Sequence, residues 1–169
     1  IYEKALHYNP NSVPLLSGHL RLSREILPPE QVEYGWNKAL KRVPDSVELW
    51  REAFLFKKSV FSMFNVSSMR ETYAKALKSL LETKQKIPHY DFIRIYECEE
   101  KMLQIFYDLC VFEKQSGYTE RAIALMQALI EMNVFCPLSM TTWSSQFRAF
   151  RDFWESEAPR IGETGALGW

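Results

Sequence analysis

Few side chains in this sequence occur in a pattern that supports chemistry. His7, His19 and His89 are far apart, and none has a carboxylate or a cysteine at the spacing of a metal-ligand set. We expect each to be an ordinary surface or core histidine. Serine, histidine and aspartate all occur, but a nucleophile-elbow sequence does not, so a hydrolase triad is not predicted.

Two short segments invite a ligand-binding interpretation. The run Glu97-Cys98-Glu99-Glu100 offers oxygen ligands, but adjacent helical positions point in different directions, which favours a solvated helix face. Gly162-Glu163-Thr164-Gly165 lacks the lysine and the preceding strand of a phosphate-binding loop. The sequence therefore predicts no catalytic residue, no metal and no cofactor.

The composition indicates a folded, electrically balanced protein. Hydrophobic residues make up 47% of the 169 residues, and 21 Lys and Arg balance 21 Asp and Glu. A globally basic nucleic-acid-binding surface is therefore not indicated. A local patch stays open as an alternative, although interspersed carboxylates favour a solvated rim for its four basic residues, Lys57, Lys58, Lys84 and Lys86.

The cysteines and the chain start bear on cellular context. Cys98, Cys110 and Cys136 have no CxxC spacing, and an odd count without a framework is typical of reduced, buried, intracellular thiols. No apolar run approaches the ~18 residues of a membrane span. The chain opens in mid-pattern without methionine, so we expect a piece of a larger protein, and a missing signal peptide says nothing about the parent.

A repeated motif determines the predicted fold. In each instance a proline is followed two residues later by serine, six residues later by a large apolar residue, and then by another one helical turn on. The first two instances are 34 residues apart, the period of a helix–turn–helix repeat that buries its apolar face against its neighbours. The three instances are Pro10, Ser12, Leu16, Leu20; Pro44, Ser46, Trp50, Phe54; and Pro137, Ser139, Trp143, Phe147.

A second repeated feature is a Lys-Ala-Leu helix end. Its alanines, Ala5, Ala39 and Ala76, are spaced 34 and 37 residues apart and would allow close helix approach. Gly35, inside one such helix, is expected to mark a close crossing. We predict an all-α, antiparallel helix-pair solenoid over residues 1–155, with about four units of which the first is partial, followed by an irregular tail over 156–169.

Helix boundaries follow from capping residues, prolines and glycines. The predicted helix that contains Trp50 has two apolar stripes: one includes Trp50, Phe54 and Phe61, and the other ends at Phe64. Two stripes imply that other helices pack on two sides of this helix. A break is considered at residues 97–101, and Gly117 is the expected stop of that helix. We expect one helix up to residue 8 and further helices over about residues 12–25, 29–41, 91–116, 120–133 and 139–155. Two more helices are expected to begin at residues 46 and 68.

The tail supports two interpretations from its residues. Its aromatic residues could cover the last apolar groove, or they could bind a partner; we favour the cover. Glycines suit an extended, closely approaching segment, and Arg160 could pair with a carboxylate of the preceding helices. The residues concerned are Phe153, Trp154, Pro159, Arg160, Gly162, Gly165, Gly168 and Trp169.

The Lys-Ala-Leu helix ends, the Pro-x-Ser turns and the run from Leu49 to Phe56 resemble half-a-tetratricopeptide repeats. Phe106, Phe112-Glu113 and Gly117 fit the same template. Proteins with similar repeats are mainly nuclear RNA-processing factors, including splicing, polyadenylation and ribosome-biogenesis scaffolds.

The C-terminal region carries a sharper resemblance. Residues 153–169, together with the helix pair over 117–129, resemble the nuclear-RNAi-defective-2 family, and the similarity covers essentially the whole chain. Many relatives carry a basic residue before the final Gly-Trp, where this chain has Leu167, which weakens an electrostatic role there.

The resemblance implies a nuclear, non-enzymatic adaptor in small-RNA-directed gene silencing and RNA surveillance. Implied partners are the RNA helicase of the nuclear exosome, through a segment N-terminal to this chain, and splicing-related proteins. The leading hypothesis is therefore a protein-binding scaffold. The alternatives are a self-associating splicing or polyadenylation scaffold and a direct RNA-binding helical repeat.

Overall fold

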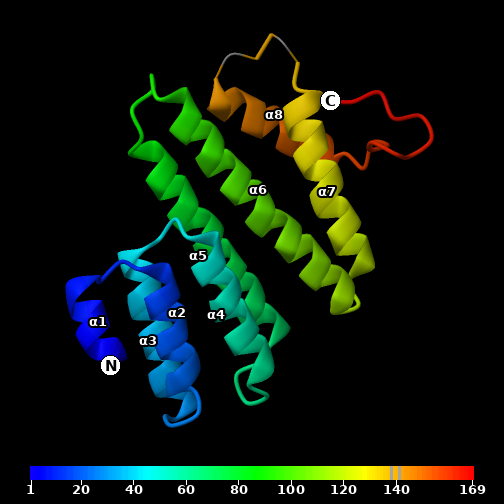
Figure 1. The fold of residues 1–169 in the computed structure, drawn as a ribbon. Coiled ribbons are helices and arrows are strands. Elements are labelled where there is room, and N and C mark those ends of the chain that lie inside the picture. The colour runs from blue at the N-terminus through cyan, green and yellow to red at the C-terminus, as the bar shows by residue number, and fades with distance from the viewer. Residues whose placement is uncertain (138, 141) are drawn as a thin grey trace. The chain divides into compact units, whose positions relative to one another are not determined.

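The computed structural model describes residues 1–137, 139–140 and 142–169, and its regular structure there is entirely α-helical (Figure 1). This confirms the predicted all-α class. The helices are α1 (Tyr2–Tyr8), α2 (Val13–Ser23), α3 (Pro29–Arg42), α4 (Val47–Ser59), α5 (Val66–Gln85), α6 (Phe92–Gln115), α7 (Thr119–Val134) and α8 (Trp143–Glu155).

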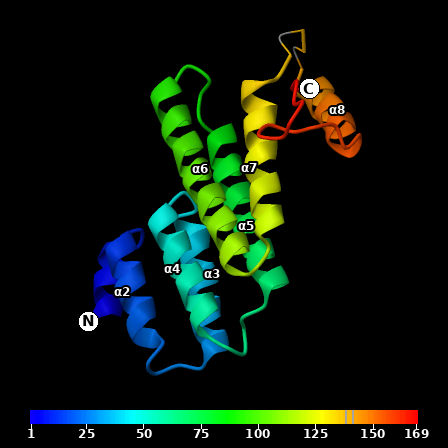
Figure 2. The same cartoon turned by 90° about the vertical axis from the view of Figure 1, so that its right-hand side faces the viewer.

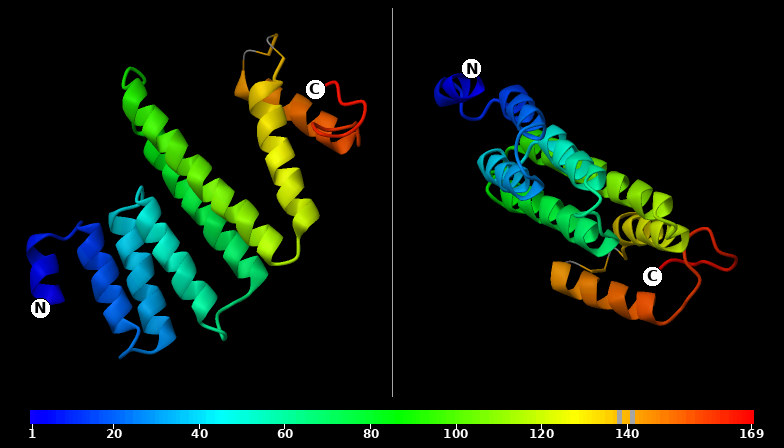
Figure 3. Two further views of the ribbon diagram at one scale, coloured as in Figure 1. Left: turned by 45° about the vertical axis from the view of Figure 1, so that its right-hand side comes forward. Right: turned by 90° about the horizontal axis from the view of Figure 1, so that it is seen from below.

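The chain divides into two compact units, residues 1–109 and 110–169. In the first unit, consecutive helices run antiparallel and lie side by side, from α1 to the greater part of α6 (Figures 2 and 3). Helix α4 packs against α2, α3 and α5, so it is contacted on more than one side, as its two apolar stripes predicted.

The first two copies of the repeated motif occupy equivalent buried positions. Leu16 and Leu20 of α2 are buried, and Trp50 and Phe54 of α4 are only 6% and 2% exposed. The hydroxyl of Ser46 caps α4 by accepting a hydrogen bond from the backbone N–H of Leu49 at 3.1 Å. Ser12 occupies the same cap position before α2 without a side-chain bond.

A hydrogen bond explains the six-residue spacing in the second copy. The indole N–H of Trp50 donates to the backbone carbonyl of Pro44 at 2.9 Å, which ties the turn to the first turns of α4. The ring of Phe54 then packs on Tyr73 of α5, with centroids 4.1 Å apart. The aromatic side chains of the motif therefore join α4 to α5, the two helices of one pair.

The third copy is not equivalent, which corrects the prediction. Helix α8 begins at Trp143 with Thr142 as its cap, so Ser139 lies before the helix and does not open it. Trp143 is 67% exposed and Phe147 is 52% exposed. A repeat position is buried only where a neighbouring helix packs on it, and α8 has no buried residue among those described. Residue 141, within the predicted helix, lies outside the described part of the chain.

Small residues set the spacing of the helices, as predicted. A Cβ atom added to Gly35 of α3 would lie 2.6 Å from Cδ2 of Leu20 in α2, so the Leu20 side chain would have to shift to admit a larger residue at this crossing. Ala39 and Ala76 are buried at corresponding positions of α3 and α5, while Ala5 of the short α1 is half-buried.

Several predicted helix boundaries were wrong. Helix α4 ends at Ser59, so Phe61 and Phe64 lie outside it and are exposed. Helix α5 begins at Val66, two residues earlier than predicted, because the side chain of Asn65 accepts hydrogen bonds from the backbone N–H groups of Ser67, at 2.8 Å, and Ser68. Helix α6 runs without a break through residues 97–101.

Ion pairs join the first helices of successive pairs. Arg21 of α2 pairs with Glu52 of α4, and Arg51 of α4 pairs with Asp108 of α6 through two contacts of 2.6 and 3.2 Å. Exposed pairs of this kind contribute little to the stability of the fold. Their importance lies in alignment, since two-point contacts from one helix to the next specify which turns lie opposite each other.

The second unit consists of the end of α6, α7, α8 and the tail. Gly117 ends α6 with a φ of 89°, a conformation that favours glycine and confirms it as the stop. Glu113 is buried beside Arg121, with 3.6 Å between Nε and Oε1. No helix in the described part of the chain is both long and apolar enough to cross a bilayer.

Candidate functional site

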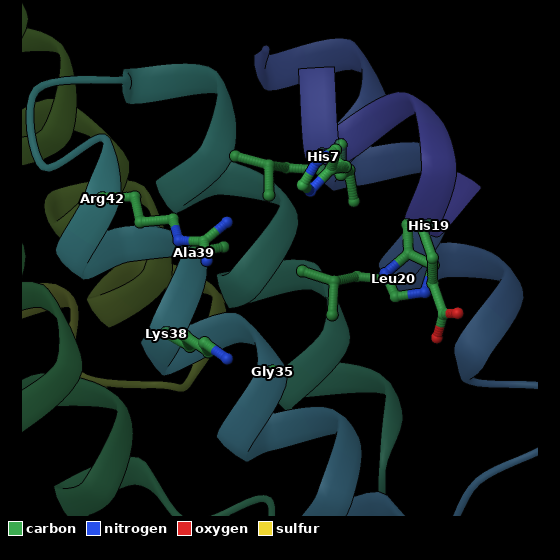
Figure 4. A pocket seen from close by; sticks show the side chains of 10 residues that line it. His7, His19, Leu20, Gly35, Lys38, Ala39 and Arg42 are labelled. Carbon is green, nitrogen blue, oxygen red and sulfur yellow. The ribbon is translucent and has the colours of Figure 1, made fainter. Parts of the chain in front are cut away.

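The fold brings two of the three histidines together, which the sequence did not indicate. His7 of α1 and His19 of α2 line one groove of about 350 Å³ with Lys38 and Arg42 of α3 (Figure 4). The lining offers no hydroxyl or thiol nucleophile, and the ring of His19 lies beside that of Tyr2 at 6.0 Å. His89 is exposed in the turn before α6.

Two of the three cysteines are buried as predicted, whereas Cys136 is only half-buried. Cys98 and Cys110 are buried, and burial raises the pKa of both thiols, which disfavours the reactive thiolate. The Cys98 thiol donates to the backbone carbonyl of Leu80 at 3.4 Å. Among the described residues, no group of three or more His, Cys, Asp or Glu side chains could hold a metal ion.

The acidic run on α6 is a solvated face, as predicted. Glu97, Glu99 and Glu100 are exposed while Cys98 points into the protein. Glu99 pairs with Lys84 of α5 at 2.5 Å. These carboxylates therefore lie on the solvent-exposed face of α6 and are not arranged as a set of metal ligands.

Beside that run, α6 exposes large apolar side chains at helical spacing. Phe92, Tyr96, Leu103 and Tyr107 are each more than half exposed, and they are separated by four, seven and four residues, which places them on one face. We refer to these four residues as the α6 stripe. Contiguous exposed apolar side chains of this kind typically mark interaction surfaces.

The tail follows a backbone path that requires its glycines. Gly162, Gly165 and Gly168 have φ values of 88°, 87° and 77°, which side-chain-bearing residues rarely adopt. The sequence predicted an extended segment, but residues 161–165 form turns. A Cβ atom added to Gly168 would lie 3.5 Å from Cβ of Phe135, an ordinary contact distance, so the predicted close approach is not what requires this glycine.

Glu131 of α7 holds the tail. It is 1% exposed, and its Oε1 accepts a hydrogen bond from the backbone N–H of Ile161 at 2.7 Å. The indole N–H of Trp169 donates to the backbone carbonyl of the same residue at 2.8 Å. Gln127, one turn earlier, donates to the Ile161 carbonyl at 2.9 Å. One face of α7 thus binds the tail at Ile161 and at its last residue, Trp169.

Glu163, one of the two acidic residues of the tail, is held by hydrogen bonds within the protein. Glu163 accepts hydrogen bonds from the backbone N–H of Arg160 at 3.0 Å and from Gln127 at 3.3 Å. These bonds hold the pKa of the Glu163 carboxyl below its ordinary value. Its carboxylate therefore stabilises the turn.

Aromatic contacts connect the tail with α8. The ring of Trp169 meets Phe150 edge-on at 5.4 Å, and Phe150 in turn contacts Phe153 and Trp154. The guanidinium of Arg160 lies 3.7 Å from the centre of the Trp154 ring, and within the described residues it forms no ion pair with a carboxylate of the preceding helices. Whether the tail serves as a cover or as a partner contact stays a prediction.

A second surface feature lies between the second helices α3 and α5. A groove of about 870 Å³ is lined by Lys38 and Lys41 from α3 and by Lys75 from α5. Lys86, the residue that directly follows α5, also lines it. Buried Trp50 contributes to its lining. We call this the α3/α5 groove. Sequence reasoning missed it, although the repeated Lys-Ala-Leu motif places Lys38 and Lys75 at equivalent positions.

The lysines considered earlier for RNA contact are mostly engaged within the protein. Lys57 pairs with Glu33 at 3.3 Å, Lys84 pairs with Glu99, and Lys58 lies over the ring of Tyr73 at 5.7 Å. Of these four residues, Lys86 lines the α3/α5 groove. Three of the four lysines in the alternative of a basic patch therefore have partners within the protein.

Comparison with known proteins identifies the family of the chain. A family model described as "NRDE-2, necessary for RNA interference" matches residues 1–169. The chain belongs to the NRDE-2 family. This confirms the family to which the tail and the preceding helix pair pointed.

Curated members of the NRDE-2 family are much longer than this chain. The human "Nuclear exosome regulator NRDE2" is 34% identical over 173 residues, covering 100% of this chain and 15% of the human protein. The Dictyostelium discoideum protein of the same name is 30% identical over 182 residues, 14% of its length. The Schizosaccharomyces pombe "Protein NRDE2 homolog" is 28% identical, covering 92% of this chain and 17% of that protein. No solved structure matches the chain significantly.

Proposed function

We propose that this chain is a non-enzymatic protein-binding scaffold within a nuclear factor of RNA surveillance and small-RNA-directed silencing. The family membership and the relatives named as nuclear exosome regulators support the nuclear RNA-related role. By the family resemblance, the wider set of partners comprises an exosome-associated RNA helicase and splicing-related proteins.

The architecture that suits this role is a half-a-tetratricopeptide-like solenoid. Equivalent burial of Leu16 and Trp50, and of Ala39 and Ala76, supports a repeat of helix pairs along the first unit. In such an array each pair contacts only its neighbours, so the outer faces of the helices remain available along its length.

The observation that carries the proposal is the α6 stripe. The four large apolar side chains of the stripe are exposed, so they lower the solubility of the protein and add nothing to its core. Aromatic residues such as three of these four are enriched at protein interfaces. The opposite face of the same helix buries Cys98 and Ile105, so the helix stays in place when the stripe is changed.

The test is affinity capture from nuclear extract with the complete chain as bait. Replacing Phe92 and Tyr96 by serine should abolish capture of nuclear RNA-processing proteins that the unchanged chain recovers. A matched control replaces two exposed apolar residues away from the stripe, Leu22 of α2 and Leu81 of α5, and should retain that capture.

Quantitative mass spectrometry of the eluates decides the outcome. Loss restricted to the stripe variant supports a protein-binding scaffold. Identical eluates from both variants, or recovery of cytosolic chaperones alone, would overturn the proposal.

A further inference from the structure

The α6 stripe has acidic side chains on both of its edges. Glu99 and Glu100 occupy the gap in the middle of the stripe. Each is three or four residues from Tyr96 and from Leu103, so it neighbours both side chains on the helix surface. Glu97 lies one turn before Glu100 on the same edge. All three carboxylates are exposed, so a partner that covers the stripe also meets their charge.

The positive charges near the stripe are already engaged. Arg94 and Lys101, the two cations of α6 along this span, each pair with a carboxylate outside the stripe. Glu97 and Glu100 form no ion pair within the described part of the chain, whereas the third carboxylate pairs with Lys84 of α5. Two uncompensated negative charges therefore flank the four apolar side chains.

The spacing of the stripe favours a helix as its occupant. Its four side chains extend over about 22 Å along one face of α6, at a rise of about 1.5 Å per residue. A second helix lying along α6 would present its own apolar side chains at the same helical spacing over that length. Helix α4 shows this arrangement inside the protein, where apolar side chains are buried on two of its faces and α2, α3 and α5 pack on it.

The charge around the stripe discriminates between the possible occupants. If two copies of α6 paired antiparallel about the middle of the stripe, Phe92 would face Tyr107 and Glu99 would face Glu100 across the interface. Like charges would then meet at its centre. A nucleic acid could stack on the aromatic rings, but the same carboxylates would repel its phosphates. Lysines or arginines on a helical partner would be attracted to them.

We propose that the α6 stripe binds a basic amphipathic helix of a partner protein. Apolar side chains of that helix cover the four stripe residues, and its lysines or arginines pair with Glu97 and Glu100. Apolar contact supplies most of the affinity, while the charges select basic partners and set the register of the helix. This assignment rests on the proposed scaffold function and gives it a partner chemistry.

The experiment measures binding of fluorescein-labelled peptides to the complete 169-residue chain by fluorescence anisotropy. The probe carries leucines at the four, seven and four spacing of the stripe, with lysines on both sides of that row. It should bind about tenfold or more tightly than the same peptide with glutamates for lysines, or with its residues shuffled so that no apolar face forms. Its binding should weaken as salt rises, and its far-ultraviolet circular dichroism should gain helical signal on binding.

Charge variants locate the binding on α6. Glu97→Lys/Glu100→Lys leaves the stripe unchanged and should weaken binding of the lysine peptide by about tenfold or more, because two attractive contacts become repulsive. The serine variant of the capture experiment should weaken it to a similar extent. Glu25→Lys/Glu82→Lys makes the same change in net charge at exposed positions outside α6 and should leave the affinity unchanged. Thermal melting checks that the variants are folded, and the comparison of peptides on the unchanged chain requires no variant.

The proposal is wrong if the lysine peptide binds no better than the glutamate or shuffled peptide, or if both charge variants lose affinity equally. Two other occupants would also overturn it. A second copy would appear in sedimentation as a dimer that the serine variant abolishes, and a nucleic acid would appear as single-stranded RNA that binds the stripe more tightly than the lysine peptide.

The outcome is distinguishable from failure of the scaffold function. Stripe-dependent capture of nuclear proteins without preference for the lysine peptide would leave the scaffold function standing and exclude a basic helix as the partner. Binding of the lysine peptide without stripe-dependent capture would count against the scaffold function alone.

Discussion

Replacing Trp50 by alanine is expected to lower the free energy of unfolding by about 3–5 kcal/mol. The side chain is 6% exposed, it packs on Phe54 with ring centroids 6.0 Å apart, and its N–H donates to the Pro44 carbonyl. The variant therefore loses buried apolar area and leaves a cavity, and it also removes the bond that ties the turn to α4. Chemical denaturation followed by far-ultraviolet circular dichroism measures the change.

Trp143→Ala is the matched control, because Trp143 occupies the same place in the repeated motif. It is 67% exposed, so its removal should change the free energy of unfolding by less than about 1 kcal/mol. Equal losses in the two variants would mean that the third copy of the motif is packed like the second, contrary to the structure.

Replacing Glu131 by alanine is expected to free the tail from α7. The variant removes the acceptor of the Ile161 N–H, and leaving a buried donor without its acceptor costs about 1–3 kcal/mol. Hydrogen exchange at the Ile161 amide should therefore accelerate by about tenfold or more. Exchange followed by mass spectrometry of peptides from residues 156–169 measures it.

Two further variants test whether the faster exchange is specific to the loss of the acceptor at Glu131. Glu131→Gln keeps an acceptor of the same size and should show a smaller increase than alanine. Glu120→Ala changes an exposed carboxylate in the first turn of α7 and should leave the tail unaffected. An unchanged Ile161 exchange rate in Glu131→Ala would show that the tail does not depend on this residue, and would weaken its interpretation as a cover.

Local sequence signals predicted the features that depend on one or two turns of chain. The Ser46 cap, the Gly117 stop and the close approach at Gly35 each follow from the conformational preference of a single residue. The burial of Trp50 and Phe54 followed from their helical spacing together with the 34-residue repeat.

The same signals failed where another part of the chain decides the outcome. Apolar periodicity continues to Phe61, but α4 ends at Ser59, and the side chain of Asn65 begins α5 before the capping pattern at Ser68 can do so. Trp143 matches the motif, yet it is 67% exposed, and its ring contacts only Phe147 of the same helix among the described aromatic side chains.

The candidate surfaces were largely hidden from sequence reasoning for a similar reason. The α3/α5 groove combines Lys38 and Lys75 from different helices, and the tail depends on Glu131, thirty residues before Ile161. Such sets exist only once helices lie side by side. The equivalent lysines of the Lys-Ala-Leu repeats were the one signal that could have revealed the groove in advance.

Carbodiimide cross-linking tests the side-by-side stacking of helix pairs most directly, and the proposed binding surface on α6 depends on that stacking. The reagent joins a lysine to a carboxylate only when the two are in contact. The structure predicts a link between Lys101 of α6 and Asp45, which precedes α4, since Nζ and Oδ2 are 3.1 Å apart. It also predicts a link between Lys84 of α5 and Glu99 of α6. Recovery of both linked peptides by mass spectrometry is the expected result, whereas links of Asp45 and Glu99 only to lysines close in sequence would contradict the stacked arrangement.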